Sequence, residues 1–212
     1  MSDDLPTLLA HRLREPLPGW RAQASYQPEM SYGRYFGPPP LHARQAAVLA
    51  LLYWRDGQWH LPLTLRPHHM LDHAGQISLP GGLIESGERS ADAALRELEE
   101  ELGVEGAEVE LLGELSSIYL LRSNFQIRTW VAAVRTCPRW QPNGAEVAEL
   151  LEVPLAHLLD PATVVSREHR GRGLTIAAPG FQWKTHHIWG ATSLILGELV
   201  AVLRECGAET AD

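Results

Sequence analysis

Three glutamates in one predicted helix are the strongest indication of chemistry in this sequence. Residues 90–102 are predicted to form that helix. Because consecutive helical residues are about 100° apart, Glu97, Glu100 and Glu101 fall within roughly 140° of arc. The leucines of the same segment occupy a different face, which suits burial. The helix would therefore bury its leucines and present three carboxylates together.

A cation would offset the repulsion among these carboxylates. Like charges at this spacing cost about 0.2–0.5 kcal/mol per pair, and carboxylate oxygens are ligands that Mg²⁺ and Mn²⁺ prefer. Glu88 lies shortly before the helix, where it can pair with Arg96. The Gly-rich turn at 80–82 would let a backbone carbonyl approach the same site. A glutamate-rich helix face alone is more often solvated surface, so the surrounding residues decide between the two interpretations.

The surrounding residues complete a longer pattern. From residue 82 to residue 104 the sequence reads Gly-x5-Glu-x7-Arg-Glu-aliphatic-x-Glu-Glu-x-Gly-aliphatic, with every fixed position filled. This segment is similar to the Nudix box, and the chain resembles the Nudix hydrolases. The resemblance implies an α/β fold, a Nudix-type α/β/α sandwich with a mixed, largely antiparallel sheet and the box as a loop-helix-loop. It also implies an enzyme that hydrolyses a nucleoside diphosphate linked to another group.

The resemblance also implies a metal site. By position, Glu97 and Glu101 match the main metal ligands of the family, and Glu100 matches a further ligand or an acid behind them. The carbonyl of Gly81 matches the backbone ligand. Two or three Mg²⁺ or Mn²⁺ ions would neutralise the diphosphate and lower the pKa of a bound water.

The general base stays open among several glutamates. Glu97 is one candidate, and Glu146 and Glu149 in the polar loop at 140–149 are two others, since the base moves among Nudix subfamilies. Arg96 and Glu88 match the ion pair that orients the site.

Segments on both sides of the box are similar to the coenzyme A pyrophosphatase subgroup. They are 63–66 (LTLR), 73–76 (HAGQ), 79–82 (LPGG), 146–155 and 188–192. This similarity implies hydrolysis of coenzyme A or an acyl derivative to phosphopantetheine species and adenosine 3′,5′-bisphosphate. The expected substrate-binding residues are Arg66, His73, Gly75, Gln76 and Gly82.

Two departures keep other functions open. Leu71 stands where the subgroup has arginine, and Asp72 adds a negative charge beside it. A charge-assisted hydrogen bond to phosphate contributes about 1.5–3 kcal/mol, so its loss favours another substrate of the same class, such as ADP-ribose. A non-catalytic nucleotide-binding module is an alternative of a different class. The three intact glutamates of the box favour catalysis over that alternative.

The remaining segments predict a mixed α/β chain with much antiparallel pairing. Region 1–40 would hold a short helix at 3–14 and an arm that packs over the core, 41–206 would be the Nudix domain, and 207–212 a tail. We expect, in chain order, strands 45–55 and 59–65 turning at Asp56-Gly57, a loop at 66–87, the helix at 90–102 between a Ser90 cap and Gly103, strands at 108–119 and 124–135, a polar loop at 140–149, a strand-to-turn element at 153–160, a hairpin at 164–183 and a last helix from about 189 to 205.

Composition narrows the class of protein and its surroundings. A net charge of -8 argues against a general nucleic-acid or anionic membrane binder. Two cysteines make no disulfide framework, which suggests a reducing compartment. The N-terminal residues lack the pattern of a signal peptide, and the longest apolar run is too short to span a bilayer. We therefore expect a cytoplasmic protein without nucleic-acid or membrane partners. The arm has no evident role in the sequence, so a homodimer is a further expectation.

Overall fold

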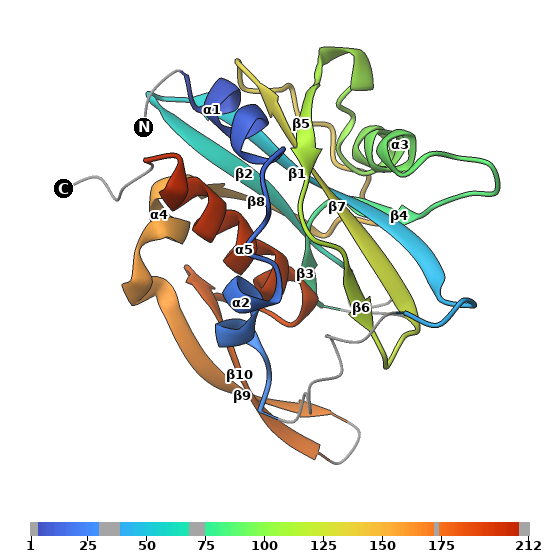
Figure 1. Ribbon diagram of the computed structural model, residues 1–212, viewed down its shortest axis with the longest axis vertical. Helices are drawn as coiled ribbons and strands as arrows, with labels where there is room; N and C mark the ends of the chain where they lie inside the picture. The colour runs from blue at the N-terminus through green and yellow to red at the C-terminus, as the bar shows by residue number, and fades with distance from the viewer. Residues whose placement is uncertain (1–3, 30–38, 68–74, 172–173, 208–212) are drawn as a thin grey trace.

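The computed structural model describes residues 4–29, 39–67, 75–171 and 174–207. Its helices are α1 (Leu5–Arg12), α2 (Trp20–Gln23), α3 (Ser90–Leu102), α4 (Leu155–Leu159) and α5 (Ala191–Glu205). Its strands are β1 (Arg44–Arg55), β2 (Gln58–Leu65), β3 (Ile77–Ser78), β4 (Gly81–Leu83), β5 (Glu110–Glu114), β6 (Ile118–Leu120), β7 (Phe125–Val134), β8 (Glu149–Pro154), β9 (Val164–Gly171), β10 (Leu174–Trp183) and β11 (His186–Trp189). Figure 1 shows their arrangement.

The main sheet is mixed, as the sequence predicted. Its central order is β3-β2-β1-β7-β5, and β8, β4 and β6 add to β2, β1 and β7. The long β1 and β7 run parallel, while the other pairs in this sheet are antiparallel. The predicted β1–β2 hairpin is confirmed: Asp56 and Gly57 both have positive φ, which matches the right-handed twist of the flanking strands.

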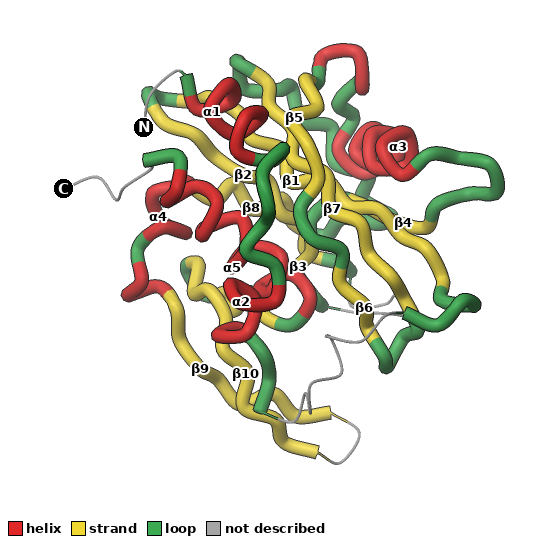
Figure 2. The backbone as a smooth tube through the Cα atoms, in the orientation of Figure 1, coloured by secondary structure: helices red, strands yellow, loops and turns green. Residues whose placement is uncertain are grey.

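The side chains of β1 alternate between two apolar layers. Ala47, Leu49 and Leu51 face the buried residues of α3, including Leu98. Leu52 and its neighbours on the other face pack with residues of α1, α4 and α5. The α/β/α sandwich is therefore confirmed, with α3 alone on one face of the sheet in Figures 1 and 2.

The last helix differs from its prediction at its start and in its burial. Trp189 belongs to β11, where it pairs with Gly180 of β10, so α5 begins only at Ala191. Gly190 has φ 71° and turns the chain from strand to helix. Residues around most of α5 are buried, and not only those of one apolar stripe, because the helix lies between the main sheet and the β9-β10-β11 sheet.

The described residues 15–29 of the N-terminal arm pack on α5, and residues 30–38 lie outside the described residues. The backbone N–H of Gly19 and the side-chain amide of Gln23 donate to the buried carboxylate of Glu198, at 3.0 and 2.9 Å. Further along, the Tyr26 ring stacks on Phe181. The described part of the arm thus has contacts within the chain, and the homodimer stays a prediction.

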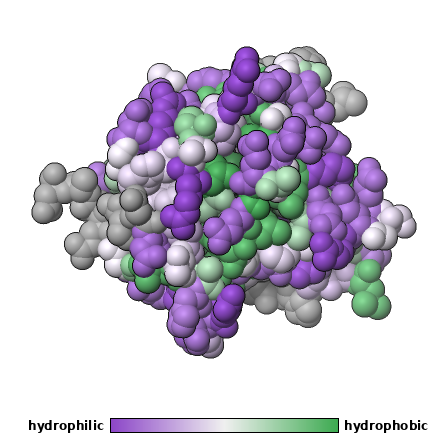
Figure 3. Space-filling model, turned by 90° about the horizontal axis from the view of Figure 1, so that it is seen from above, coloured by the Kyte–Doolittle hydropathy of each residue, from purple (hydrophilic) through white to green (hydrophobic). Residues whose placement is uncertain are grey.

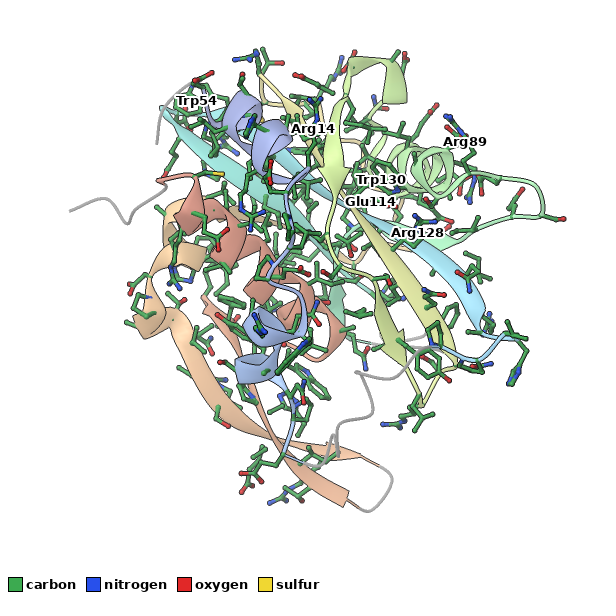
Figure 4. All side chains as sticks on the ribbon, in the orientation of Figure 1. Arg14, Trp54, Arg89, Glu114, Arg128 and Trp130 are labelled. Carbon is green, nitrogen blue, oxygen red and sulfur yellow. The ribbon has the colours of Figure 1, made fainter. Side chains whose placement is uncertain are left out.

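Local details at the ends of other elements also differ from the sequence analysis. Ser90 is the first residue of α3 rather than its cap; its hydroxyl accepts from the Trp130 indole at 3.1 Å and donates to Glu114 at 3.4 Å. Arg128 makes two hydrogen bonds to the Glu114 carboxylate. The side chains of Arg128, Glu114 and Trp130 lie together beside β7 in Figure 4. Gly103 ends α3 with φ 70°, as predicted.

Two segments contain more regular structure than the sequence predicted. The expected loop at 66–87 includes β3 and β4, which exist because they pair with β2 and β1. The expected strand-to-turn element at 153–160 is the end of β8 followed by the short helix α4.

The surface seen from above is mostly hydrophilic, with an apolar area open near its centre (Figure 3). Within the described ranges, no helix combines the length and the apolar character that a membrane crossing requires.

Candidate active site

Two glycines of β4 bring the box turn close to its neighbours. A Cβ on Gly81 would lie 2.4 Å from the carbonyl oxygen of Ala47, so this position must be glycine for β4 to pair closely with β1. A Cβ on Gly82 would lie 2.3 Å from Oε1 of Glu97. The Glu97 carboxylate therefore packs directly against the backbone of the turn.

Glu101 is the most buried of the three box glutamates, with 2% of its surface exposed. Burial raises its pKa to about 7, and the nearby charges of Glu97 and Glu146 act in the same direction. The positive charge of Arg66 and a hydrogen bond from the backbone N–H of Gly81 oppose this rise. A carboxylate buried in this way without a full ion-pair partner is a strong candidate to bind a cation.

Arg96 joins the other acidic side chains of the box. Its guanidinium donates to both oxygens of Glu88, at 2.9 and 3.1 Å, to Glu97 at 2.8 Å and to Glu100 at 3.2 Å. It also donates to the Leu83 carbonyl at 3.0 Å. The predicted contact between Arg96 and Glu88 is present, and it ties the loop before α3 to the helix.

The pKa values in this cluster follow their surroundings. The Arg96 hydrogen bonds hold the pKa of Glu88 below its usual range. Burial raises the pKa of Glu97, although Arg96 partly offsets that rise. Glu100 has half of its side chain exposed, so it lies at the edge of the cluster.

The loop at 140–149 is attached to the end of α3. The backbone N–H of Gln141 donates to the Leu102 carbonyl and that of Asn143 donates to the Glu101 carbonyl, both at 2.9 Å. These bonds satisfy carbonyls that a helix end leaves without partners. The same loop carries Glu146, whose negative charge raises the pKa of both Glu97 and Glu101.

The other candidate base from this loop lies elsewhere. Glu149, the first residue of β8, pairs in register with Leu65 and contacts Nε2 of His186 at 3.3 Å. Glu149 thus contacts His186, while the charge of Glu146 raises the pKa of Glu97 and of Glu101.

The predicted substrate-binding residues are described only in part. Arg66 and Gly75 close the end of the β2–β3 hairpin, since the Gly75 N–H donates to the Arg66 carbonyl and the Arg66 N–H to that of Gln76. Within the described ranges, the buried Nε of Arg66 has no hydrogen-bond partner. His73, like Leu71 and Asp72 beside it, lies outside the described residues.

One contact of the site was missed by the sequence analysis. Thr64 of β2 donates its hydroxyl to Oε2 of Glu101 at 3.3 Å. The sequence shows Thr64 only as part of the segment 63–66. A polar residue among the buried side chains of β2 was the available signal, but its partner 37 positions away depends on the tertiary fold.

The donor set suits a hard divalent cation. In the part of the chain that the structure describes, no three acidic, imidazole or thiol side chains form a ready-made metal-binding group. Arg96 engages both Glu97 and Glu100 instead. The buried Glu101 carboxylate, the adjacent Glu97 and the backbone of the turn nonetheless offer only oxygen ligands, which fit Mg²⁺ or Mn²⁺.

Known proteins resemble this chain in sequence and in fold. The NUDIX domain family model matches residues 43–170. A protein named "Uncharacterized Nudix hydrolase NudL" from Salmonella paratyphi B is 35% identical over 166 residues, which cover 75% of this chain and 82% of that protein. The structure of a MutT/nudix family protein from Enterococcus faecalis has a TM-score of 0.55 at 18% identity and covers 84% of this chain and 69% of its own. The structure of a MutT protein from Methanosarcina mazei has a TM-score of 0.51 at 16% identity and covers 78% of this chain and 98% of its own.

Proposed function

We propose, because this chain belongs to the Nudix hydrolase family, that the diphosphate it hydrolyses is that of coenzyme A or an acyl-coenzyme A. In this reaction the oxygen of a water molecule bonds to one phosphorus and the bridging P–O bond breaks. The water gives up one proton to a base, and the bridging oxygen leaves with the other phosphoryl group. The products are a phosphopantetheine species and adenosine 3′,5′-bisphosphate.

A single arrangement carries the proposal for the reaction centre. Glu97 lies against the backbone of Gly82, while Glu101 is buried beside it and Glu146 is close enough to raise the pKa of both. Three carboxylates at one buried edge repel one another unless positive charge joins them. This arrangement supports a site built for cations and an anionic substrate.

Glu97, Glu101 and the Gly81 carbonyl would hold the divalent cation, with Glu100 at the rim. When bound, Mg²⁺ or Mn²⁺ would neutralise the diphosphate and make a water molecule acidic enough to attack phosphorus. The guanidinium of Arg96 supports this cluster by fixing the Glu97 and Glu100 side chains relative to Glu88. We assign Arg96 and Glu88 an orienting role.

Glu146 is the base that we favour for the attacking water. It lies near the metal-binding carboxylates through the loop that Gln141 and Asn143 attach to α3. Glu149 contacts His186 instead. Glu97 stays a weaker candidate because Arg96 already donates to it.

The substrate assignment is supported by the segments similar to the coenzyme A pyrophosphatase subgroup. Among them, Arg66 stands at the end of β2 beside the buried Glu101, with its Nε free of hydrogen-bond partners among the described residues. A guanidinium there suits a phosphate oxygen. ADP-ribose is the second candidate substrate, since Leu71 stands where that subgroup has arginine and Asp72 adds a negative charge beside it.

Product analysis tests both the reaction and its substrate. The purified protein is incubated with Mg²⁺ or Mn²⁺ and, separately, coenzyme A, acetyl-coenzyme A, ADP-ribose and diadenosine polyphosphates. We expect adenosine 3′,5′-bisphosphate from coenzyme A. Turnover of ADP-ribose with none of coenzyme A would move the assignment to the second candidate.

Two variants connect that activity to the site. Glu101→Gln should lose turnover by at least about a hundredfold, whereas Glu105→Gln, an exposed glutamate shortly after the helix, should keep it. Wild-type turnover in Glu101→Gln would remove Glu101 from the site. No turnover of any substrate by the wild-type protein would favour a nucleotide-binding module.

A further inference from the structure

Thr64 of β2 is buried directly beside the proposed metal ligand Glu101. Thr64 has 1% of its surface exposed and Glu101 has 2%. The two side chains come from a strand and a helix 37 positions apart, and Thr64 Oγ1 lies 3.3 Å from Oε2 of Glu101. Water has little access to this pair, so the threonine hydroxyl supplies a hydrogen bond that solvent does not supply to the buried carboxylate.

The hydrogen positions at this pair follow from simple accounting. A carboxylate that binds a cation is ionised and can only accept hydrogen bonds. Thr64 therefore donates its single proton to Glu101 at 3.3 Å in preference to the neutral carbonyl of Ser78, which lies farther away at 3.5 Å. The hydroxyl of Ser78 lies 3.4 Å from Thr64 Oγ1 on the neighbouring strand and is then the donor to Thr64. The three groups form one directed chain, Ser78 to Thr64 to Glu101.

The start of this chain is itself held in place by another element. Ser78 belongs to β3, which has only two residues and pairs with the end of β2. The hydroxyl of Thr192, in the first turn of α5, donates to the carbonyl of Ile77 in β3 at 2.8 Å, and this bond is buried. A two-residue strand is therefore fixed by both β2 and α5, which gives Ser78 a defined position.

We propose that Thr64 is a positioning residue, which sets the rotation of the Glu101 carboxylate and thereby the direction in which its lone pairs meet the cation. This inference rests on the proposed function, in which Glu101 is a metal ligand. Partners behind metal ligands typically contribute about ten- to a hundredfold to metal affinity. The nonpolar isostere of threonine should therefore fold but bind the cation less tightly.

The test measures Mn²⁺ binding by electron paramagnetic resonance, in full-length protein without substrate. We expect Thr64→Val to raise the dissociation constant at least about tenfold, and Thr64→Ser, which keeps the hydroxyl, to restore it to within a few fold. Thr129→Val is the matched control, because it makes the same change at a buried strand threonine whose hydroxyl has no partner among the described residues. It should bind Mn²⁺ as the wild-type protein does.

The outcomes separate this inference from the proposed function. Unchanged Mn²⁺ binding in Thr64→Val, with binding lost in Glu101→Gln, would overturn the role of Thr64 alone. Unchanged binding in Glu101→Gln would overturn both the metal site and the inference. If Thr64→Val does not fold, Ser78→Ala decides, since it removes the donor that orients Thr64. A loss of Mn²⁺ affinity in Ser78→Ala that is smaller than in Glu101→Gln would support the hydrogen-bond chain from Ser78 to Glu101. Unchanged Mn²⁺ affinity in Ser78→Ala would refute it.

Discussion

Replacement of Gly82 by alanine would test how closely the turn of the box supports Glu97. The new Cβ would lie 2.3 Å from Oε1 and 2.5 Å from Cδ of Glu97, and contacts under 3.0 Å are essentially never seen. The obstructing atoms are the far end of a flexible side chain, so the carboxylate can move rather than the backbone. To restore an ordinary contact it must retreat by about 1 Å, a displacement that can cost roughly a hundredfold in rate.

The expected result is a loss of function without a loss of folding. Gly82 does not have a positive φ, so alanine fits its backbone, and the melting temperature should change little. We expect kcat/KM for the diphosphate substrate to fall about a hundredfold, which corresponds to about 2.7 kcal/mol of transition-state stabilisation. Mn²⁺ affinity should fall as well.

Gly106→Ala provides the control for this variant. Its Cβ would meet Leu95 at an ordinary distance of 3.4 Å, shortly after the same helix, and activity should be unaffected. If Gly82→Ala retained kcat/KM and Mn²⁺ affinity within about twofold of the wild-type protein, Glu97 would not be a metal ligand in this position.

Two further predictions concern stability. Thr129→Val should raise the free energy of unfolding by about 1 kcal/mol, because the fully buried hydroxyl has no hydrogen-bond partner among the described residues. Thr163→Val, which loses bonds to two carbonyls, should instead be destabilised in the same urea titrations. A Thr129→Val variant less stable than the wild-type protein would contradict the reasoning. Burial lowers the pKa of His169 and of His187, whose rings stack and hydrogen-bond at 2.8 Å. The unfolded chain therefore binds more protons just below pH 6.5, so stability should be complete above that pH and decrease as the pH falls through it. His169→Gln should have a shallower decrease between pH 7.5 and 5.5, and an identical slope would exclude this pair as a cause.

The box was accessible from the sequence because its geometry is local. Helical periodicity alone places Glu97, Glu100 and Glu101 on one face, and the Arg96–Glu88 contact spans only eight positions. The β1–β2 hairpin was equally local, since two residues with positive φ determine its turn. Helical spacing thus accounts for the shared face of the three carboxylates, whereas the family, the α/β/α fold class and the candidate metal ligands were inferred from the resemblance of residues 82–104 to the Nudix box.

The errors in the sequence analysis occurred where pairing between distant segments decides. β3 and β4 have no pattern of their own and exist through bonds to β2 and β1. The apolar stripe of the last helix predicted a start near Trp189, but pairing with Gly180 places this residue in a strand. The hydroxyl of Ser90 suits a helix cap, yet the Trp130 indole and Glu114 compete for it.

The sequence by itself determined which residues are candidates for the chemistry, because residue type and helical spacing suffice to bring carboxylates together. Only the tertiary structure decided how those carboxylates are held. Burial raises the pKa of Glu101, the charge of Glu146 in the attached loop raises it further, and Glu149 contacts His186. Thr64 also contacts Glu101. Such contacts depend on which strand and loop fold over the helix, and that is set by packing of the whole core rather than by any local pattern.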